Sequence, residues 1–160
     1  TVYLYYPSKE ALLAAVVGES TGPLLAEVAA LMSDQSRSAG ELIRAVTGLW
    51  VERFESVGAT GLPKLIYAES SNFPAIARAY LGQAGKARVL FEVLIQRGIT
   101  AGEFRDVDVP ATARAFLGGV IFQMIYRHSL GPLEDAPYDF QRALDGHVEL
   151  ALAGLRKRLD

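Results

Sequence analysis

The sequence contains no cysteine in its 160 residues. Disulfide bonds and thiolate metal sites are therefore excluded, because both require cysteine sulfur. There are only two histidines, His128 and His147, and they lie far apart in the chain. A zinc site would need both together with carboxylates, and packing in the core or at an interface is the better interpretation of each. The sequence thus predicts neither a metal site nor a cofactor.

Long hydrophobic runs are also missing. The longest apolar stretch, Ala115–Tyr126, has twelve residues, includes Gln123, and is bounded by Arg114 and Arg127. A membrane-spanning helix needs about 20 apolar residues, so we expect a core helix here and no membrane. No basic segment followed by an apolar core begins the chain, which predicts no signal peptide and a cytoplasmic location.

Sequence features of nucleic-acid binding and of catalysis are weak. The net charge is −2, whereas a free-standing DNA-binding domain is usually basic because it must neutralise phosphates. Nucleophile-elbow, phosphate-loop and zinc-protease motifs are all missing. Paired carboxylates such as Glu52 with Glu55 lie beside polar neighbours, not in the apolar settings that shift a carboxyl pKa for catalysis. We therefore predict that the chain is neither a complete DNA-binding domain nor an enzyme.

Apolar residues recur at spacings of three and four almost throughout, which predicts an all-α bundle of about six helices. The first begins at Ser8, is interrupted at Gly18–Pro23 and resumes to Met32. The expected bounds of the others are Ser38–Val57, opened by a capping box with Glu41; Leu62–Ser70; Asn72–Arg97, stopped by Gly98; Asp108 to the Gly131–Pro132 break; and Asp139–Arg158.

The most specific segment is residues 1–13, Thr-Val-Tyr-Leu-Tyr-Tyr-Pro-Ser-Lys-Glu-Ala-Leu-Leu. It resembles the end of the DNA-recognition helix and the start of the next helix in the tetracycline-repressor (TetR) family, with Tyr6 in place of the common phenylalanine. The stretch Arg97–Asp108 resembles the loop that precedes the last two helices in many members. The resemblance divides the chain into the end of the recognition helix and its turn, 1–7, and a helical ligand-binding and dimerisation domain, 8–160.

The resemblance implies that Thr1, Tyr3 and Tyr5 contact operator DNA and that Lys9 contacts a phosphate. Hydroxyl and ammonium groups suit phosphate contacts, which position a protein on DNA without reading its sequence. Packing of the helix turn is the alternative role for these tyrosines. The remainder of the helix-turn-helix would lie upstream of Thr1.

The resemblance also implies a small, largely apolar effector bound among the middle helices. No inward-pointing cluster of basic residues is apparent, which argues against a highly anionic effector. The candidate ligand-binding residues, each with plain core packing as its alternative, are Trp50, Phe54, Tyr67, Phe91, Phe122, Gln123 and Tyr126.

We also expect a homodimer that is formed by the last two helices of each subunit. Glycines 118, 119, 146 and 154, with Ala143, would allow close approach of a partner helix. The residues predicted to form the dimer interface are Phe116, Val120, Phe140, Leu144, His147, Val148, Ala151 and Leu155. The alternative is that this stripe packs only within its own subunit. The predicted function is a TetR-type repressor that an effector releases from operator DNA; the alternative is a dimeric helical small-molecule-binding module without a DNA role.

Overall fold

The computed structural model describes residues 15, 24, 26–56 and 58–157. Residues 26–33 are helical. The labelled elements that follow are α2 (Ala39–Ser56), α3 (Leu62–Glu69), α4 (Pro74–Thr100), α5 (Val109–Arg127), the short 3-10 helix η2 (Gly131–Leu133) and α6 (Phe140–Leu155). No strand occurs in the described part of the chain, where one isolated β-bridge pairs Phe104 with Arg156. The predicted all-α fold is confirmed.

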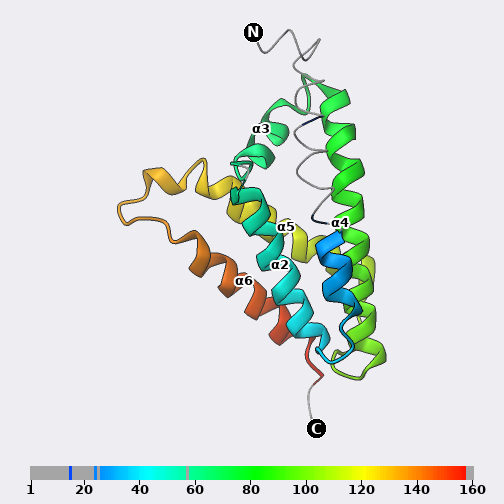
Figure 1. Cartoon of the computed structure of the whole chain (residues 1–160). Helices are drawn as coiled ribbons and strands as arrows, with labels where there is room; N and C mark the ends of the chain where they lie inside the picture. Colours follow the sequence, from blue (N-terminus) through cyan, green and yellow to red (C-terminus); the bar gives the residue numbers. More distant parts are fainter. Residues whose placement is uncertain (1–14, 16–23, 25, 57, 158–160) are drawn as a thin grey trace.

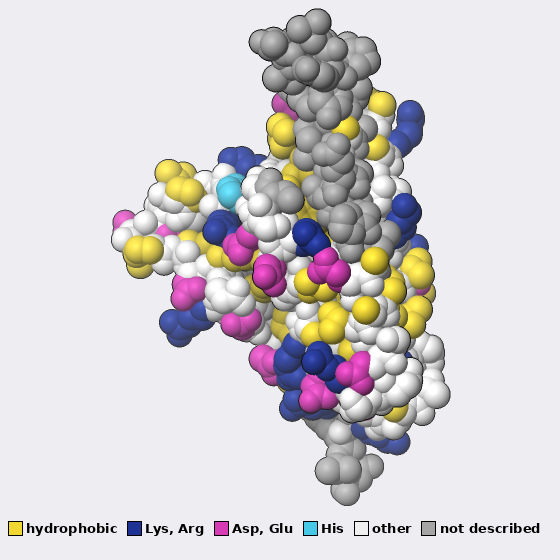
Figure 2. Space-filling view, viewed as in Figure 1, with side chains coloured by type: hydrophobic (Ala, Val, Ile, Leu, Met, Phe, Trp, Pro, Cys, Tyr) yellow, Lys and Arg dark blue, Asp and Glu magenta, His cyan; other side chains and the backbone are white. Residues whose placement is uncertain are grey.

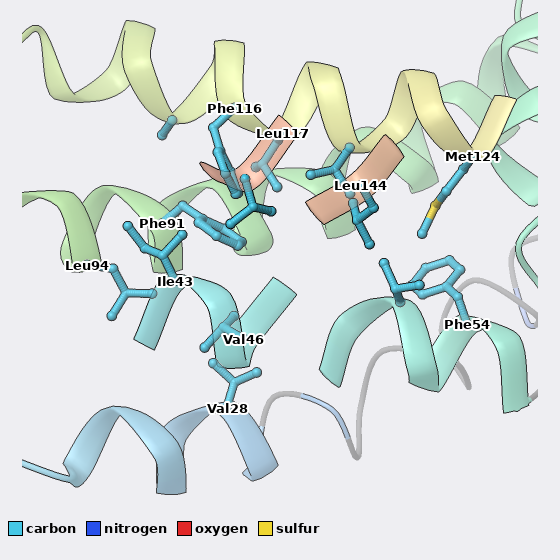
Figure 3. Close-up of a cluster of buried hydrophobic side chains, with 14 of the residues drawn as sticks. Val28, Ile43, Val46, Phe54, Phe91, Leu94, Phe116, Leu117, Met124 and Leu144 are labelled. Atoms are coloured by element: carbon cyan, nitrogen blue, oxygen red, sulfur yellow. The ribbon is translucent and has the colours of Figure 1, made fainter. Parts of the chain in front are cut away.

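The bundle is organised around α4 and α5. In Figure 1, α4 (green) forms one side of the molecule and α5 (yellow) passes behind α2. Helix α4 packs against α2, α3 and α5, and α5 also packs against α3 and α6. Figure 3 shows the core where these helices meet, with Val28, Val46, Phe91 and Leu117 converging from four segments. Figure 2 shows acidic and basic side chains intermixed on one face, in keeping with the small net charge.

Three predicted helix starts are confirmed by side-chain caps. The backbone N–H of Ser38 donates to Oε2 of Glu41 at 2.8 Å, and the Glu41 N–H donates to Oγ of Ser38 at 3.2 Å. Asp108 accepts a hydrogen bond from the Ala111 N–H, and Asp139 accepts one from the Arg142 N–H, each at 2.9 Å. These bonds satisfy N–H groups that lack partners within the helix.

Both predicted ends of α4 are wrong. Asn72 is not the N-cap, because its N–H already closes a turn onto the Glu69 carbonyl and Phe73 takes the cap position. Gly98 does not stop the helix, which continues to Thr100 before the chain turns at Gly102 with φ +73°. Gly98 is instead needed for packing: a Cβ there would lie 2.8 Å or less from three ring atoms of Phe104.

The predicted ends of the last two helices are too late. Helix α5 ends at Arg127, and Gly131 belongs to η2. Helix α6 ends at Leu155 because the next residue, Arg156, pairs with Phe104. By length and composition α5 is the one described helix that could cross a membrane. A central helix of a bundle passes the same test, and α5 packs against three other helices here.

The last turn of α4 and the segment that follows it hold the N-terminal part of the described chain in place through Arg97 and Glu103. The Arg97 guanidinium donates hydrogen bonds to three backbone carbonyls at the end of segment 26–33 and in the loop before α2, those of Met32, Asp34 and Arg37, at 2.9–3.2 Å. The Glu103 carboxylate accepts from the first two N–H groups of α2, on Ala39 and Gly40, at 2.7 and 2.9 Å. A carboxylate is favourable at a helix N-terminus, so Glu103 holds α2 while Arg97 holds the segment before it.

Candidate ligand-binding cavity

An apolar cavity of about 60 Å³ lies inside the bundle. It is lined by side chains from α2, α3, α4 and α5, together with Leu24 and Val28 from the N-terminal part. Trp50 and Phe54 of α2 form part of the wall, with ring centroids 5.3 Å apart in an edge-to-face arrangement. Ala84 and Ala87 of α4 stand where larger side chains would fill the space. The described lining residues include no aspartate or glutamate.

Tyr80 supplies the main polar group of this cavity. Burial, with a smaller contribution from Tyr67, raises the pKa of Tyr80 from 10.0 to about 12. The phenol therefore stays protonated at neutral pH and can donate a hydrogen bond. No partner for its hydroxyl occurs among the described residues. Gln83 and the exposed Lys86 are the other polar lining residues on α4.

A groove of about 280 Å³ adjoins the cavity between α3, α4 and α5. Four residues line both spaces: Tyr80, Ala84, Leu117 and Ile121. The groove also has Tyr67 and two arginines, Arg88 and Arg114, in its lining. Nε of Arg88 is buried without a hydrogen bond, although Oε1 of Glu92 lies 3.2 Å away. Arg114 is exposed and makes no ion pair within the described part of the chain.

The predicted ligand-binding residues are divided between these spaces and the surface. Trp50, Phe54 and Phe91 line the inner cavity. Tyr67 lines the outer groove, with its ring centroid 6.4 Å from that of Tyr80. The remaining three candidates, Phe122, Gln123 and Tyr126, line neither space.

The helical phase of α5 explains why these three residues line neither space. Leu117 and Ile121 face the cavity, and each step along an α-helix rotates the side chain by about 100°. Phe122 is therefore directed elsewhere and is 55% exposed. Gln123 accepts a hydrogen bond from the Tyr138 hydroxyl, and Tyr126 donates one to Glu134 at 2.5 Å.

Apart from Phe91, sequence reasoning missed the contribution of α4. Tyr80, Gln83, Ala84, Ala87 and Phe91 all line the cavity, and their spacings of three and four place them on one face of this helix. The available signal was the pair of alanines on that face beside a tyrosine and a glutamine. Such a mixture of small and polar residues is unusual on a face that is otherwise apolar.

The residues predicted to form the dimer interface lie mostly in the core of the single chain, and the interface stays a prediction. Six of its members are buried within their own chain, namely Phe116, Val120, Phe140, Leu144, Val148 and Leu155. His147 donates from Nε2 to the Phe116 carbonyl at 2.8 Å and packs against Gly119, while Ala151 is partly buried against the core. The six buried side chains thus pack within their own subunit, whereas His147 and Ala151 are partly exposed. The stripe on α6 is core.

Two other faces of the same helices are open. On α5 the face opposite the core carries Ala111, Ala115, Gly118 and Phe122, all exposed. On α6 the neighbouring face carries Ala143, Gly146, Leu150 and Gly154, with Leu150 75% exposed. A Cβ added at Gly118, Gly146 or Gly154 would meet nothing within 4 Å. Both faces therefore consist of small or apolar side chains that are largely exposed, although the Phe122 ring contacts that of Tyr126.

The predicted DNA-contacting residues Thr1, Tyr3, Tyr5 and Lys9 lie outside the described residues. Within the described residues, no three histidine, aspartate or glutamate side chains are grouped so that they could hold a metal ion. No protein-family model, no curated protein and no solved structure matches the chain.

Proposed function

We propose that this chain is the ligand-binding and dimerisation part of a cytoplasmic TetR-type transcriptional repressor, which a small molecule releases from operator DNA. The observation that carries the proposal is an apolar cavity inside an all-α bundle, lined in part by Tyr80, whose hydroxyl has no hydrogen-bond partner among the described residues. Ligand sites of this kind are concave and mostly apolar, with few polar groups that orient the ligand. The resemblance of residues 1–13 to the end of a recognition helix supports the DNA role.

The position of the cavity supports a coupling between ligand and DNA. Leu24 and Val28 line it, and they belong to the part of the chain that follows residues 1–13. Arg97 of α4 holds the end of the same segment through the Met32 carbonyl. A ligand that displaces α4 or Val28 would therefore act on this segment. For release, the ligand must bind the DNA-free conformation more tightly than the DNA-bound one.

The open faces of α5 and α6 support a homodimer. Helix α5 is nearly uniformly hydrophobic around its axis, which is typical of a helix buried on all sides. Its face with Gly118 and Phe122 is nevertheless exposed in the single chain. A second copy that places its own α5 and α6 on this face would form a four-helix interface about a two-fold axis. Such a dimer provides the two half-site contacts that operator recognition requires.

Selection of DNA fragments by the product of the complete reading frame tests this function. Random genomic fragments are incubated with the protein, and bound fragments are sequenced. The proposal predicts enrichment of a sequence with two-fold symmetry whose half-sites lie about one helical turn, or a multiple of it, apart. A dimeric protein that binds ligand and enriches no sequence would instead establish the alternative, a small-molecule-binding module without a DNA role.

A further inference from the structure

The inner cavity and the outer groove form two parts of one site. Tyr80, Ala84, Leu117 and Ile121 line both, so the two spaces share a wall. Tyr80 is the largest of the four and carries a hydroxyl without a partner in the described residues.

The two parts differ in charge. The inner part is mainly apolar, with aromatic walls from Trp50, Phe54 and Phe91, and its charged lining residue, Lys86, is exposed to solvent. The groove has the guanidinium groups of Arg88 and Arg114, and its described lining includes no acidic side chain. The charge of Arg88 is partly compensated by Glu92. Among the described residues, however, its Nε–H donor has no hydrogen bond and Arg114 has no ion-pair partner. The site therefore combines an apolar end with a positively charged end.

We propose that the ligand of this site is a small amphipathic monoanion, with a carboxylate between Arg88 and Arg114 and an apolar body that passes Tyr80 into the inner cavity. Guanidinium groups bind carboxylates through paired, charge-assisted hydrogen bonds. The Tyr80 hydroxyl donates to the same carboxylate or to a polar atom next to it. This inference rests on the proposed function, because it takes the cavity to be a small-molecule site.

The volumes limit the size of this ligand. A closed apolar cavity of roughly 150 Å³ holds benzene, whereas the inner cavity measures about 60 Å³. The inner part therefore takes the end of a short chain or, after side chains move, one small ring. The groove, at about 280 Å³, has room for the carboxylate and its adjoining atoms. Long-chain or multi-ring acids do not fit without displacement of a helix.

Trp50 provides a direct readout, because it is the chain's single tryptophan and lies in the cavity wall. Hexanoate, hexan-1-ol and hexylammonium have the same apolar chain and differ in charge at the head. Each is titrated into the intact protein at neutral pH up to about 10 mM, the range expected for ligands with so few atoms. We expect hexanoate to change Trp50 fluorescence with a dissociation constant several times lower than that of the alcohol, and hexylammonium to bind most weakly.

Two matched variants locate the carboxylate. Arg114→Gln removes a cation from the groove, and Arg78→Gln removes an exposed cation of α4 that lines neither space. Arg114→Gln should weaken hexanoate binding about three- to tenfold and leave hexan-1-ol binding unchanged. Arg78→Gln should alter neither. Loss of hexanoate preference in Arg78→Gln alone would overturn the assigned position of the head group.

The remaining outcomes separate this inference from the function on which it rests. Equal or tighter binding of hexan-1-ol or hexylammonium overturns the anionic ligand and leaves the cavity as an effector site. The absence of a fluorescence change with all three probes also overturns the inference. Neither result bears on the selection of operator DNA, which tests the proposed function separately.

Discussion

The contact between α5 and α6 predicts a large penalty for one added methyl group. Gly119 lies against the imidazole of His147, and a Cβ there would lie 2.6 Å or less from three ring atoms. The ring has little freedom to move, because Nε2 donates to the Phe116 carbonyl at 2.8 Å and its centroid lies 5.4 Å from that of Phe116. Overpacking of this kind costs about 1–3 kcal/mol. Loss of the hydrogen bond costs about 1 kcal/mol more.

Replacement of glycine within a helix also has a favourable effect, of up to about 1 kcal/mol. We therefore expect Gly119→Ala to lower the free energy of unfolding by about 2 kcal/mol overall. Gly82→Ala is the matched control, because Gly82 lies inside α4 and an added Cβ meets nothing within 4 Å. The control should be as stable as the natural protein or more stable by up to about 1 kcal/mol.

Urea unfolding followed by circular dichroism measures both variants. If Gly119→Ala were as stable as Gly82→Ala, His147 would not lie on Gly119, and the packing of α6 on α5 would be refuted. If both variants unfolded at a lower urea concentration than the natural protein, Gly82→Ala would not be a valid control. The loss of stability in Gly119→Ala could then not be assigned to the contact with His147.

Three further predictions concern the hydrogen bonds of Arg97, the proposed dimer and the buried phenol of Tyr80. Arg97→Ala, which removes three hydrogen bonds to backbone carbonyls, should lower the free energy of unfolding by about 2–4 kcal/mol in urea titrations. Arg97→Lys should restore only part of this stability. Full stability of either variant would show that the Arg97 hydrogen bonds do not hold the loop before α2. Leu150→Asp should shift the protein from dimer to monomer in sedimentation at micromolar concentration, whereas Leu81→Asp, at an exposed leucine of α4, should leave the dimer intact. Because the folded pKa of Tyr80, about 12, exceeds the ordinary tyrosine value of 10.0, its contribution to stability is present below pH 10 and is lost as the pH rises toward 12. The tyrosinate absorbance difference between the natural protein and Tyr80→Phe should show this late titration, and a midpoint near 10 would contradict the burial.

Local signals made the helix starts predictable. Ser38, Asp108 and Asp139 each cap a helix through a hydrogen bond to a residue three positions later, so the whole signal lies within one turn of sequence. The end of α4 was not predictable in this way. Gly98 is required by the ring of Phe104, a contact that depends on the turn at Gly102.

The residues that line the cavity could be predicted only on a helix with one clearly polar face. Helix α2 has an apolar face, and its candidates Trp50 and Phe54 do line the cavity. Helix α5 is apolar all around its axis, so its sequence does not indicate which residues face the cavity. Phe122 was therefore predicted to line it, whereas Ile121 does. On α6 the stripe of Leu144 and Val148 was recognised as buried, but sequence alone does not distinguish burial in the subunit from burial against a partner.

Release of operator DNA by the cavity's ligand is the most direct test of the central claim. The ligand is taken from the natural protein and identified by mass spectrometry, and the selected duplex carries a fluorophore for anisotropy. Ala87→Phe, which fills the cavity from α4, is the control variant. The account predicts that the ligand weakens DNA binding of the natural protein about 5- to 150-fold and leaves Ala87→Phe bound. Equal release of both proteins, or release of neither, would contradict it.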